Sequence, residues 1–163
     1  MSVIIREITK EEYPLLEDFL YHAIFIPPGE KLPPRELIFE PEIYIYVDGF
    51  GSRYGDIGVV AERQGNVVGA AWTRIIPAYG HVDENTPELA ISILPAYRGQ
   101  AIGTSLMEKL FECLRERGFT RTSLSVQKDN PAVSFYKRLG YKITGEKQDQ
   151  VGHEDFIMIK ELL

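Results

Sequence analysis

The chain has 163 residues, 44% of them hydrophobic and 26% charged, with a formal net charge of -6 at pH 7, and this length and composition predict one globular domain over residues 1–163. The negative charge argues against a nucleic-acid partner, because binding phosphates requires a basic surface. No apolar run reaches the roughly 18 residues of a membrane span, the first residues turn acidic too early for a secretory signal, and the single cysteine permits no internal disulfide, so we expect a cytoplasmic protein without a membrane partner.

The first third of the chain predicts a strand, a helix and one ambiguous segment. Val3–Ile8 is an apolar run typical of a short strand, and Thr9 with Glu12 three residues later indicates a capping box at the start of a helix. Apolar residues follow at helical spacing: Leu15, Leu16, Phe19, Leu20 and Ala23. Within Pro27–Gly55 the apolar residues alternate as in a strand, yet Pro41 is equally typical of a first helical residue, so both structures remain open.

From residue 56 onward strands and helices are clearer. A hairpin is predicted from Asp56–Arg63 and Val67–Ile76 around a turn at Gln64–Asn66. Further strands are expected at Glu88–Leu94, Thr122–Val126, Tyr141–Thr144 and Phe156–Ile159, and helices at Ile102–Gly118 and Asn130–Leu139. The first of these helices carries an apolar stripe at Ile102, Leu106, Leu110 and Leu114. The alternation of strand and helix after Glu88 favours parallel pairing around a helical crossover.

The segment between the strand at Glu88–Leu94 and the next helix suits a phosphate group. Its residues are Arg98, Gly99, Gln100, Ala101, Ile102, Gly103 and Thr104. Small residues let the backbone approach a ligand, and free N–H groups at a helix N-terminus bind anions. Arg98 adds a cationic side chain suited to phosphate, and Thr104 adds a hydroxyl. The segment lacks the Gly-Lys-Ser/Thr ending of a P-loop and the G-x-G-x-x-G order of a dinucleotide fold. An ordinary strand-to-helix turn is the alternative interpretation.

Two motifs in this order resemble the GNAT N-acetyltransferase superfamily. The acetyl-CoA motif of that family is Arg or Gln, two residues, Gly, one residue, then Gly or Ala. Arg98 and Gly103 match its first and last positions, and Ala101 stands where the family usually has its middle glycine. The segment from residue 123 to residue 146 resembles the second CoA segment of the family, with matches at Asn130, Val133, Tyr136, Gly140 and Tyr141.

The resemblance implies a GNAT-like acyl-CoA N-acyltransferase fold of the mixed α/β class. Its central sheet is mixed but mostly antiparallel, has about six to seven strands, splays between the fourth and fifth strands, and is flanked by about four helices. It also implies one GNAT-like acetyltransferase domain over residues 1–163 and favours a helix within Pro27–Gly55. A homodimer is expected on this resemblance alone.

The implied activity is direct transfer of the acetyl group of acetyl-CoA to a primary amine in a ternary complex, with no metal and no other cofactor. The amine must be neutral to attack, yet an alkyl ammonium has a pKa of about 10.4, so a base is needed. The oxyanion that forms needs donors, which backbone N–H groups supply. A non-catalytic acyl-CoA binding module on the same fold is the alternative.

The resemblance assigns roles to particular residues. Tyr136 would be the general acid near the CoA sulfur, and Glu88 the candidate base, directly or through water. His81, Asp83 and Glu84 are weaker candidates for the base. We also considered five aromatic residues as lining for an acceptor pocket, although aromatic residues more commonly pack in a core: Phe25, Tyr44, Tyr46, Trp72 and Tyr79.

Acetyl-CoA would be held by three sets of groups. The segment Arg98–Thr104 would bind the diphosphate, and the backbone of Ile93 and Leu94 would pair with the pantetheine arm as an added strand does. Asn130 would contact the same arm, although its position before Pro131 also suits a helix N-cap. The three histidines are far apart in the sequence and indicate no metal site.

Overall fold

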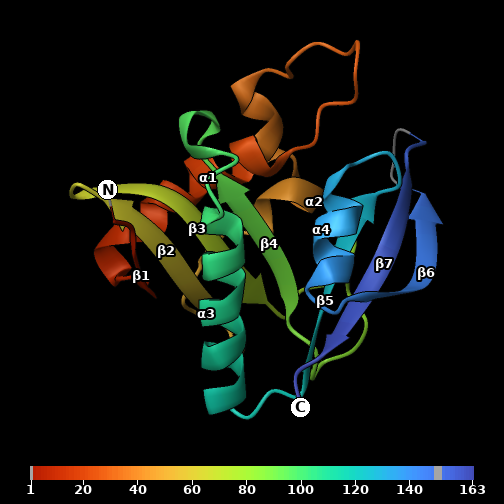
Figure 1. The fold of residues 1–163 in the computed structure, drawn as a ribbon. Helices are drawn as coiled ribbons and strands as arrows, with labels where there is room; N and C mark the ends of the chain where they lie inside the picture. Colours follow the sequence, from red (N-terminus) through yellow and green to blue (C-terminus); the bar gives the residue numbers. More distant parts are fainter. Residues whose placement is uncertain (1, 149–151) are drawn as a thin grey trace.

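The computed structural model describes residues 2–148 and 152–163 and arranges seven strands in one sheet (Figure 1). The strands are β1 (Ile4–Glu7), β2 (Ile57–Arg63), β3 (Asn66–Arg74), β4 (Glu88–Ile93), β5 (Arg121–Gln127), β6 (Lys142–Gln148) and β7 (Glu154–Glu161). Their order in the sheet is β1-β2-β3-β4-β5-β7-β6, and every neighbouring pair is antiparallel except the parallel pair β4–β5. The expected mixed, mostly antiparallel sheet is confirmed. Parallel pairing stops after the first crossover, because β7 lies between β5 and β6 and is antiparallel to both.

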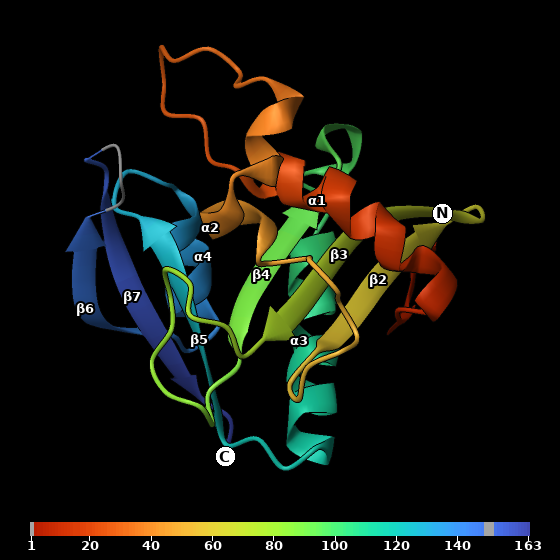
Figure 2. The ribbon, with the colours of Figure 1, turned by 180° about the vertical axis from the view of Figure 1, so that it is seen from behind.

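Helices cover both faces of this sheet. The α-helices are α1 (Leu16–Ala23), α2 (Pro41–Tyr44), α3 (Ile102–Glu116) and α4 (Ala132–Arg138), and the 3-10 helices are η1 (Lys10–Leu15), η2 (Arg35–Phe39) and η3 (Pro95–Tyr97). Figure 1 shows α3 and α4 in front of the sheet, and Figure 2 shows α1 and α2 on the opposite face. None of the described helices has both the length and the apolar character that a membrane span requires.

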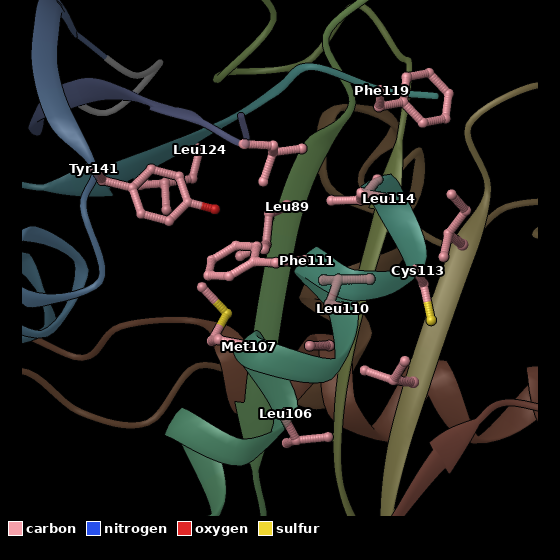
Figure 3. Close-up of a cluster of buried hydrophobic side chains, with 14 of the residues drawn as sticks. Leu89, Leu106, Met107, Leu110, Phe111, Cys113, Leu114, Phe119, Leu124 and Tyr141 are labelled. Atoms are coloured by element: carbon pink, nitrogen blue, oxygen red, sulfur yellow. The ribbon is translucent and has the colours of Figure 1, made fainter. Parts of the chain in front are cut away.

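The face under α3 carries the larger core, because the predicted apolar stripe of that helix is buried. Leu106, Leu110 and Leu114 are each 0% exposed. Figure 3 shows them with Leu89 of β4 and Leu124 of β5, both of which belong to the same buried cluster. Since these two leucines lie on adjacent strands, α3 packs against both halves of the sheet at once.

The opposite face holds a second core, which needs alternate residues of the same strands. On β3, Ala71 belongs to the cluster under α3, whereas Trp72 belongs to the cluster under α1 with Leu16 and Phe19. A strand sends successive side chains to opposite faces, and β3 is apolar at both sets of positions. The sheet is therefore buried on both sides at its centre.

The ambiguous segment between residues 27 and 55 contains helices and no strand. Pro41 is the first residue of α2, and turns continue from there to residue 52. Ile43 and Val47 pack in the second core. They are four residues apart, a spacing that suits one helical face as well as strand alternation. The helical interpretation is confirmed, and the apolar residues that alternate in the sequence lie in a helix and the turns that follow it.

Candidate active site

The sheet splits between β4 and β5, as the family resemblance implied. These strands share a single backbone pair, Glu88 with Ser123, and no further pair is described beyond it. On the other edge of β4, the Leu94 N–H donates to the Val68 carbonyl at 2.9 Å. Backbone groups alternate in an antiparallel ladder, so the N–H and C=O of Ile91 and Ile93 face the split. Of the two residues predicted to pair with a pantetheine arm, Ile93 therefore faces the split and Leu94 faces β3.

A cavity of about 420 Å³ occupies the split. Residues 24–27, which follow α1, line it together with residues of α1, η2, α2, β4, β5, α4 and β7 and of the loops between elements. The polar groups that converge on it include Glu30, Tyr46, Glu88, Ser125, Tyr136 and Asp155. The two residues predicted to carry the chemistry, Glu88 and Tyr136, thus meet in one cavity although they lie far apart in the sequence.

Glu88 is a buried carboxyl group poised near neutral pH. Its side chain is 2% exposed, and burial raises its pKa from 4.5 to about 7. The hydrogen bond from the Tyr46 hydroxyl, the nearby Gly80 amide and the charge of Lys147 act in the opposite direction. Oε1 accepts no well-formed hydrogen bond from the described residues. Tyr46 therefore holds one carboxylate oxygen, and the other is buried without a hydrogen-bond partner among the described residues.

Gly80 lets the loop between β3 and β4 close over this carboxyl group. A Cβ atom at residue 80 would lie 2.9 Å from Glu88 Cδ and 2.8 Å from the Ser125 backbone nitrogen. The Ser125 nitrogen belongs to the backbone of β5 and cannot move without displacing that strand, so glycine is needed for this approach. Figure 2 shows the loop crossing in front of β5. The burial that raises the pKa of Glu88 depends in part on this close contact.

Tyr136 lies on α4 and stacks edge-on against Tyr141, with 5.8 Å between the ring centroids. Burial raises its pKa to about 12. No hydrogen bond of its hydroxyl to another described residue is present. Tyr136 therefore brings a protonated phenol to the cavity across from Glu88.

The other candidate bases are less suited to the role. Thr86, the Asn85 amide and Arg121 hold the pKa of Asp83 at about 2. Glu84 is 84% exposed and lies 3.6 Å from His81. None of the three lines the cavity. Among the acidic residues that the sequence singled out, the structure brings only Glu88 to the split.

The predicted phosphate segment wraps the start of α3, where Ile102 is the first helical residue. The first intrahelical bond runs from the Ser105 N–H to the Ala101 carbonyl, which leaves the amides of Ile102, Gly103 and Thr104 without an intrahelical acceptor. Gly99 has φ of +77°, and a Cβ there would meet no atom within 4 Å. These open amides at a helix N-terminus suit a diphosphate.

Ala101, which stands where the family usually has its middle glycine, is in a strained backbone conformation. It adopts φ of +63° as the N-cap of α3, a left-handed conformation that costs a residue with a Cβ about 1–2 kcal/mol. Its side chain is exposed and its N–H belongs to the same set of amides. The departure from glycine therefore affects stability more than it blocks the segment.

Two arginines lie at this segment: Arg98, which the sequence predicted, and Arg63, which it did not. Arg98 Nε donates to the Ile93 carbonyl at 3.0 Å, and Nη2 donates to the His22 carbonyl at 3.2 Å, which ties the segment to β4 and α1. Arg63, at the end of β2, donates to Gln100 Oε1 at 2.7 Å. No local motif marks Arg63, because the hairpin of β2 and β3 brings it there.

Of the remaining residues that the sequence singled out, some line the cavity and others pack elsewhere in the fold. Asn130 Oδ1 accepts the Ala132 N–H at 2.9 Å, so Asn130 caps α4, and it lines the cavity as well. Of the five aromatic residues considered, Phe25, Tyr46 and Tyr79 line the cavity. Trp72 is 1% exposed and packs in the second core, and Tyr44 donates to Glu17 away from the cavity. Among the described residues, no group of three His, Cys, Asp or Glu side chains is arranged to hold a metal ion.

Known proteins match this chain in sequence and in fold. A family model described as the acetyltransferase (GNAT) family matches residues 10–141. An uncharacterized N-acetyltransferase of Mycobacterium tuberculosis is 35% identical over 86 residues, which cover 50% of this chain and 55% of that protein. The chain thus spans about half the length of the curated relatives that head the comparison.

Solved structures resemble the whole chain at low sequence identity. The ribosomal-protein-S18-alanine N-acetyltransferase from Escherichia coli has a TM-score of 0.71 at 20% identity and covers 99% of this chain and 94% of that one. The paia N-acetyltransferase from Thermoplasma acidophilum, solved in complex with coenzyme A, has a TM-score of 0.69 at 20% identity and covers 99% of each chain. At such identities the likeness establishes the fold.

Proposed function

Because this chain belongs to the acetyltransferase (GNAT) family, we propose that it transfers the acetyl group of acetyl-CoA directly to a primary amine. The observation that carries the proposal is the buried carboxyl group of Glu88, which has a pKa of about 7. This group lies where β4 and β5 separate and lines the same cavity as Tyr136. A base is most effective when its pKa lies near the working pH.

The residues of the chain fit acetyl-CoA as co-substrate. The free amides at the start of α3, with Arg98 and Arg63 beside them, suit the diphosphate. The backbone groups of Ile91 and Ile93 that face the split suit the amides of a pantetheine arm. The same N–H groups would donate to the thioester oxygen as negative charge develops on it. Bound acetyl-CoA supplies the acetyl group, and the chain supplies position and proton handling.

Glu88 would accept the proton of the incoming ammonium group, directly or through water. At pH 7 about half of the Glu88 carboxyl groups are ionised, because the pKa is about 7. The burial that holds this pKa up also keeps the proton acceptor out of bulk water. An acceptor amine would approach Glu88 within the cavity that residues 24–27 also line.

The raised pKa of Tyr136 favours hydrogen-bond donation over complete proton transfer. A phenol with a pKa of about 12 releases its proton less readily than a thiol, whose ordinary pKa is about 8.5. We therefore propose that the Tyr136 hydroxyl donates a hydrogen bond to the leaving sulfur while the bond breaks. This contribution stabilises the thiolate without requiring complete proton release from Oη.

The first experiment is a thermal shift with acetyl-CoA, CoA, ATP and NAD in parallel. A tight ligand at saturation raises the unfolding midpoint by several degrees, and we expect that shift with the two CoA compounds only. An amine screen that follows thiol release from acetyl-CoA should then find an acceptor. Glu88→Gln and Tyr136→Phe should each reduce kcat about 100-fold or more at pH 7 while CoA still shifts the midpoint.

The outcomes separate the alternatives. A shift with ATP or NAD and none with CoA would reject the proposal. A shift with CoA but no thiol release with any amine would favour the non-catalytic acyl-CoA binding module on the same fold. The single domain, cytoplasmic location and homodimer remain predictions of the sequence, and light scattering of the purified chain measures the last of these.

A further inference from the structure

We propose that Tyr46 is a positioning residue, which holds Glu88 in place through its hydroxyl and couples this carboxylate to the segment that covers the acceptor side of the cavity. The proposal rests on the proposed function for the meaning of Glu88, but its geometric basis is independent of acetyl-CoA. Tyr46 lies 42 residues before its partner and donates its hydroxyl hydrogen to Glu88 Oε2. It follows α2 directly, and both side chains line the cavity.

Two side chains of β3 hold the backbone around Tyr46 by hydrogen bonds. Trp72 Nε1 donates to the Tyr46 carbonyl at 2.9 Å. Arg74 Nη1 donates to the carbonyls of Ile45 and Asp48 at 2.9 Å and 2.7 Å, on either side of Tyr46. Trp72 and Arg74 are each 1% exposed. Three buried hydrogen bonds to carbonyls therefore set where the Tyr46 ring stands, before its hydroxyl makes any contact.

The guanidinium that forms this anchor is itself paired with a buried carboxylate. Arg74 Nε and Nη2 donate to the two carboxylate oxygens of Asp56 at 2.9 Å and 3.1 Å. Asp56 in turn accepts the backbone N–H groups of Gly51 and Arg53 at 2.9 Å and 3.0 Å. A bidentate pair whose guanidinium makes two further hydrogen bonds to carbonyls has little freedom to rotate. The anchor under Tyr46 is thus a rigid part of the fold and not a flexible contact.

The direction of the hydrogen bond fixes its effect on Glu88. Burial and the charge of Glu88 raise the pKa of Tyr46 well above its ordinary value, while Ser125 and the Tyr79 amide lower it by less. The phenol therefore keeps its proton at physiological pH and can only donate to the carboxylate. A donor to the charged form of an acid favours ionisation. Tyr46 thus offsets part of the burial penalty at Glu88 and leaves Oε1 as the buried oxygen that has no hydrogen-bond partner among the described residues.

Other charged or titratable groups act on the same carboxyl group, and the test must hold them constant. The charge of Lys147 on β6 lowers the pKa of Glu88. Titratable groups from α4, from β7 and from three loops line the cavity: Tyr79, Tyr136, His153, Asp155, Glu30 and Lys31. Replacing Tyr46 with phenylalanine leaves all of these side chains in the sequence, although it also removes the hydroxyl that interacts with Ser125 and the Tyr79 amide. It removes one oxygen atom and preserves the ring and the three carbonyl contacts.

Tyr44 provides a matched control. It lies two residues earlier, at the end of α2, and its hydroxyl donates to Glu17 Oε2 at 2.8 Å. Neither Tyr44 nor Glu17 lines the cavity. Tyr44→Phe and Tyr46→Phe therefore remove the same group, from the same segment, and each breaks one hydrogen bond to a glutamate. Only the second glutamate faces the site.

The experiment is a pH titration of Glu carboxyl carbons by NMR in the ligand-free protein, with the Glu88 signal assigned by its loss in Glu88→Gln. Tyr46→Phe should raise the pKa of Glu88 by about one to two pH units, because a hydrogen bond to a charged group is lost. Tyr44→Phe should leave it unchanged. Placing difluorotyrosine, a stronger donor, at position 46 should lower it. An unchanged pKa in Tyr46→Phe, or an equal rise in both variants, would overturn the proposal.

Kinetics add a second readout once an acceptor is known. The ratio of kcat/KM between Tyr46→Phe and wild type should fall at pH 7 by about 5- to 50-fold and recover toward one by pH 9, as the altered Glu88 ionises. A loss that is equal at every pH would mean a structural role and would overturn the proposal. Absence of CoA binding by the wild type would reject the proposed function and leave the NMR result on Tyr46 intact.

Discussion

Replacing Glu88 with glutamine should make the protein more stable at neutral and alkaline pH. The carboxyl group is 2% exposed, and its pKa is about 7 in the folded chain against an ordinary value of 4.5. An acid whose pKa is raised by folding binds its proton more tightly in the folded state. Its contribution to stability is therefore fully present below pH 4.5 and is lost as the pH rises through about 7.

The magnitude follows from the two pKa values. A difference of roughly 2.5 pH units at 1.36 kcal/mol per unit corresponds to a loss of about 3 kcal/mol in the free energy of unfolding between pH 4.5 and pH 8. Glu88→Gln cannot ionise, so it should not lose this amount. For a chain of this length, 3 kcal/mol corresponds to about 6–12 °C in the unfolding midpoint.

Urea unfolding at pH 4.5, 6 and 8 measures the effect. The free energy of unfolding of Glu88→Gln minus that of the wild type should increase by about 3 kcal/mol from the lowest to the highest pH. Any constant difference in packing between the two side chains cancels in this comparison. Glu108→Gln removes an exposed carboxylate from α3 and serves as the control for charge alone. A difference that stays the same at all three values would refute the reasoning, since Glu88 would then titrate as an ordinary glutamate.

Three further substitutions test the fold around the site. Arg74→Met should destabilise the chain by about 3–5 kcal/mol in urea, because it leaves the Asp56 carboxylate buried and unpaired, and adding Asp56→Asn should recover part of the loss. Leu110 lies on the buried face of α3 and is 0% exposed, so Leu110→Ala should lower the free energy of unfolding by about 2–5 kcal/mol. Ile4→Ala, at a residue that is 55% exposed, should lower it far less. Ala101→Gly should raise stability by up to about 1 kcal/mol in thermal unfolding, as relief of the left-handed strain outweighs the added freedom of glycine in the unfolded chain; a lower midpoint would contradict this.

Local patterns were sufficient for most of the fold. The stripe from Ile102 to Leu114 predicted a helix with one buried face, and that face packs on the sheet. Glu12 accepts the Thr9 N–H at 3.0 Å, as the capping box predicted, although the first turns are a 3-10 helix that contains Pro14. These features depend on residues within a turn or two of one another, where spacing determines which side chains meet.

The partners of the site residues were beyond such patterns. The bond between Tyr46 and Glu88 joins positions 42 residues apart, and Arg63 meets Gln100 across 37 residues. Each contact exists because the sheet places two elements side by side, and nothing in the neighbouring sequence marks either residue. Glu88 could be named from its place at the start of β4, but the burial that raises its pKa comes in part from a separate loop that contains Gly80.

Trp72 and Arg74 of β3 hold residues 45–48 through hydrogen bonds to main-chain carbonyl oxygens, not to side chains of that segment. Every amino acid has the same carbonyl oxygen. The attachment of this segment therefore does not depend on the identity of the neighbouring side chains that point away from the core, as long as the turn is kept. A library that randomises Glu42, which lines the cavity from α2, would vary the acceptor side on an unaltered frame. In this way the fold separates the part that must be rigid from the part that can be exchanged when a different amine is to be recognised.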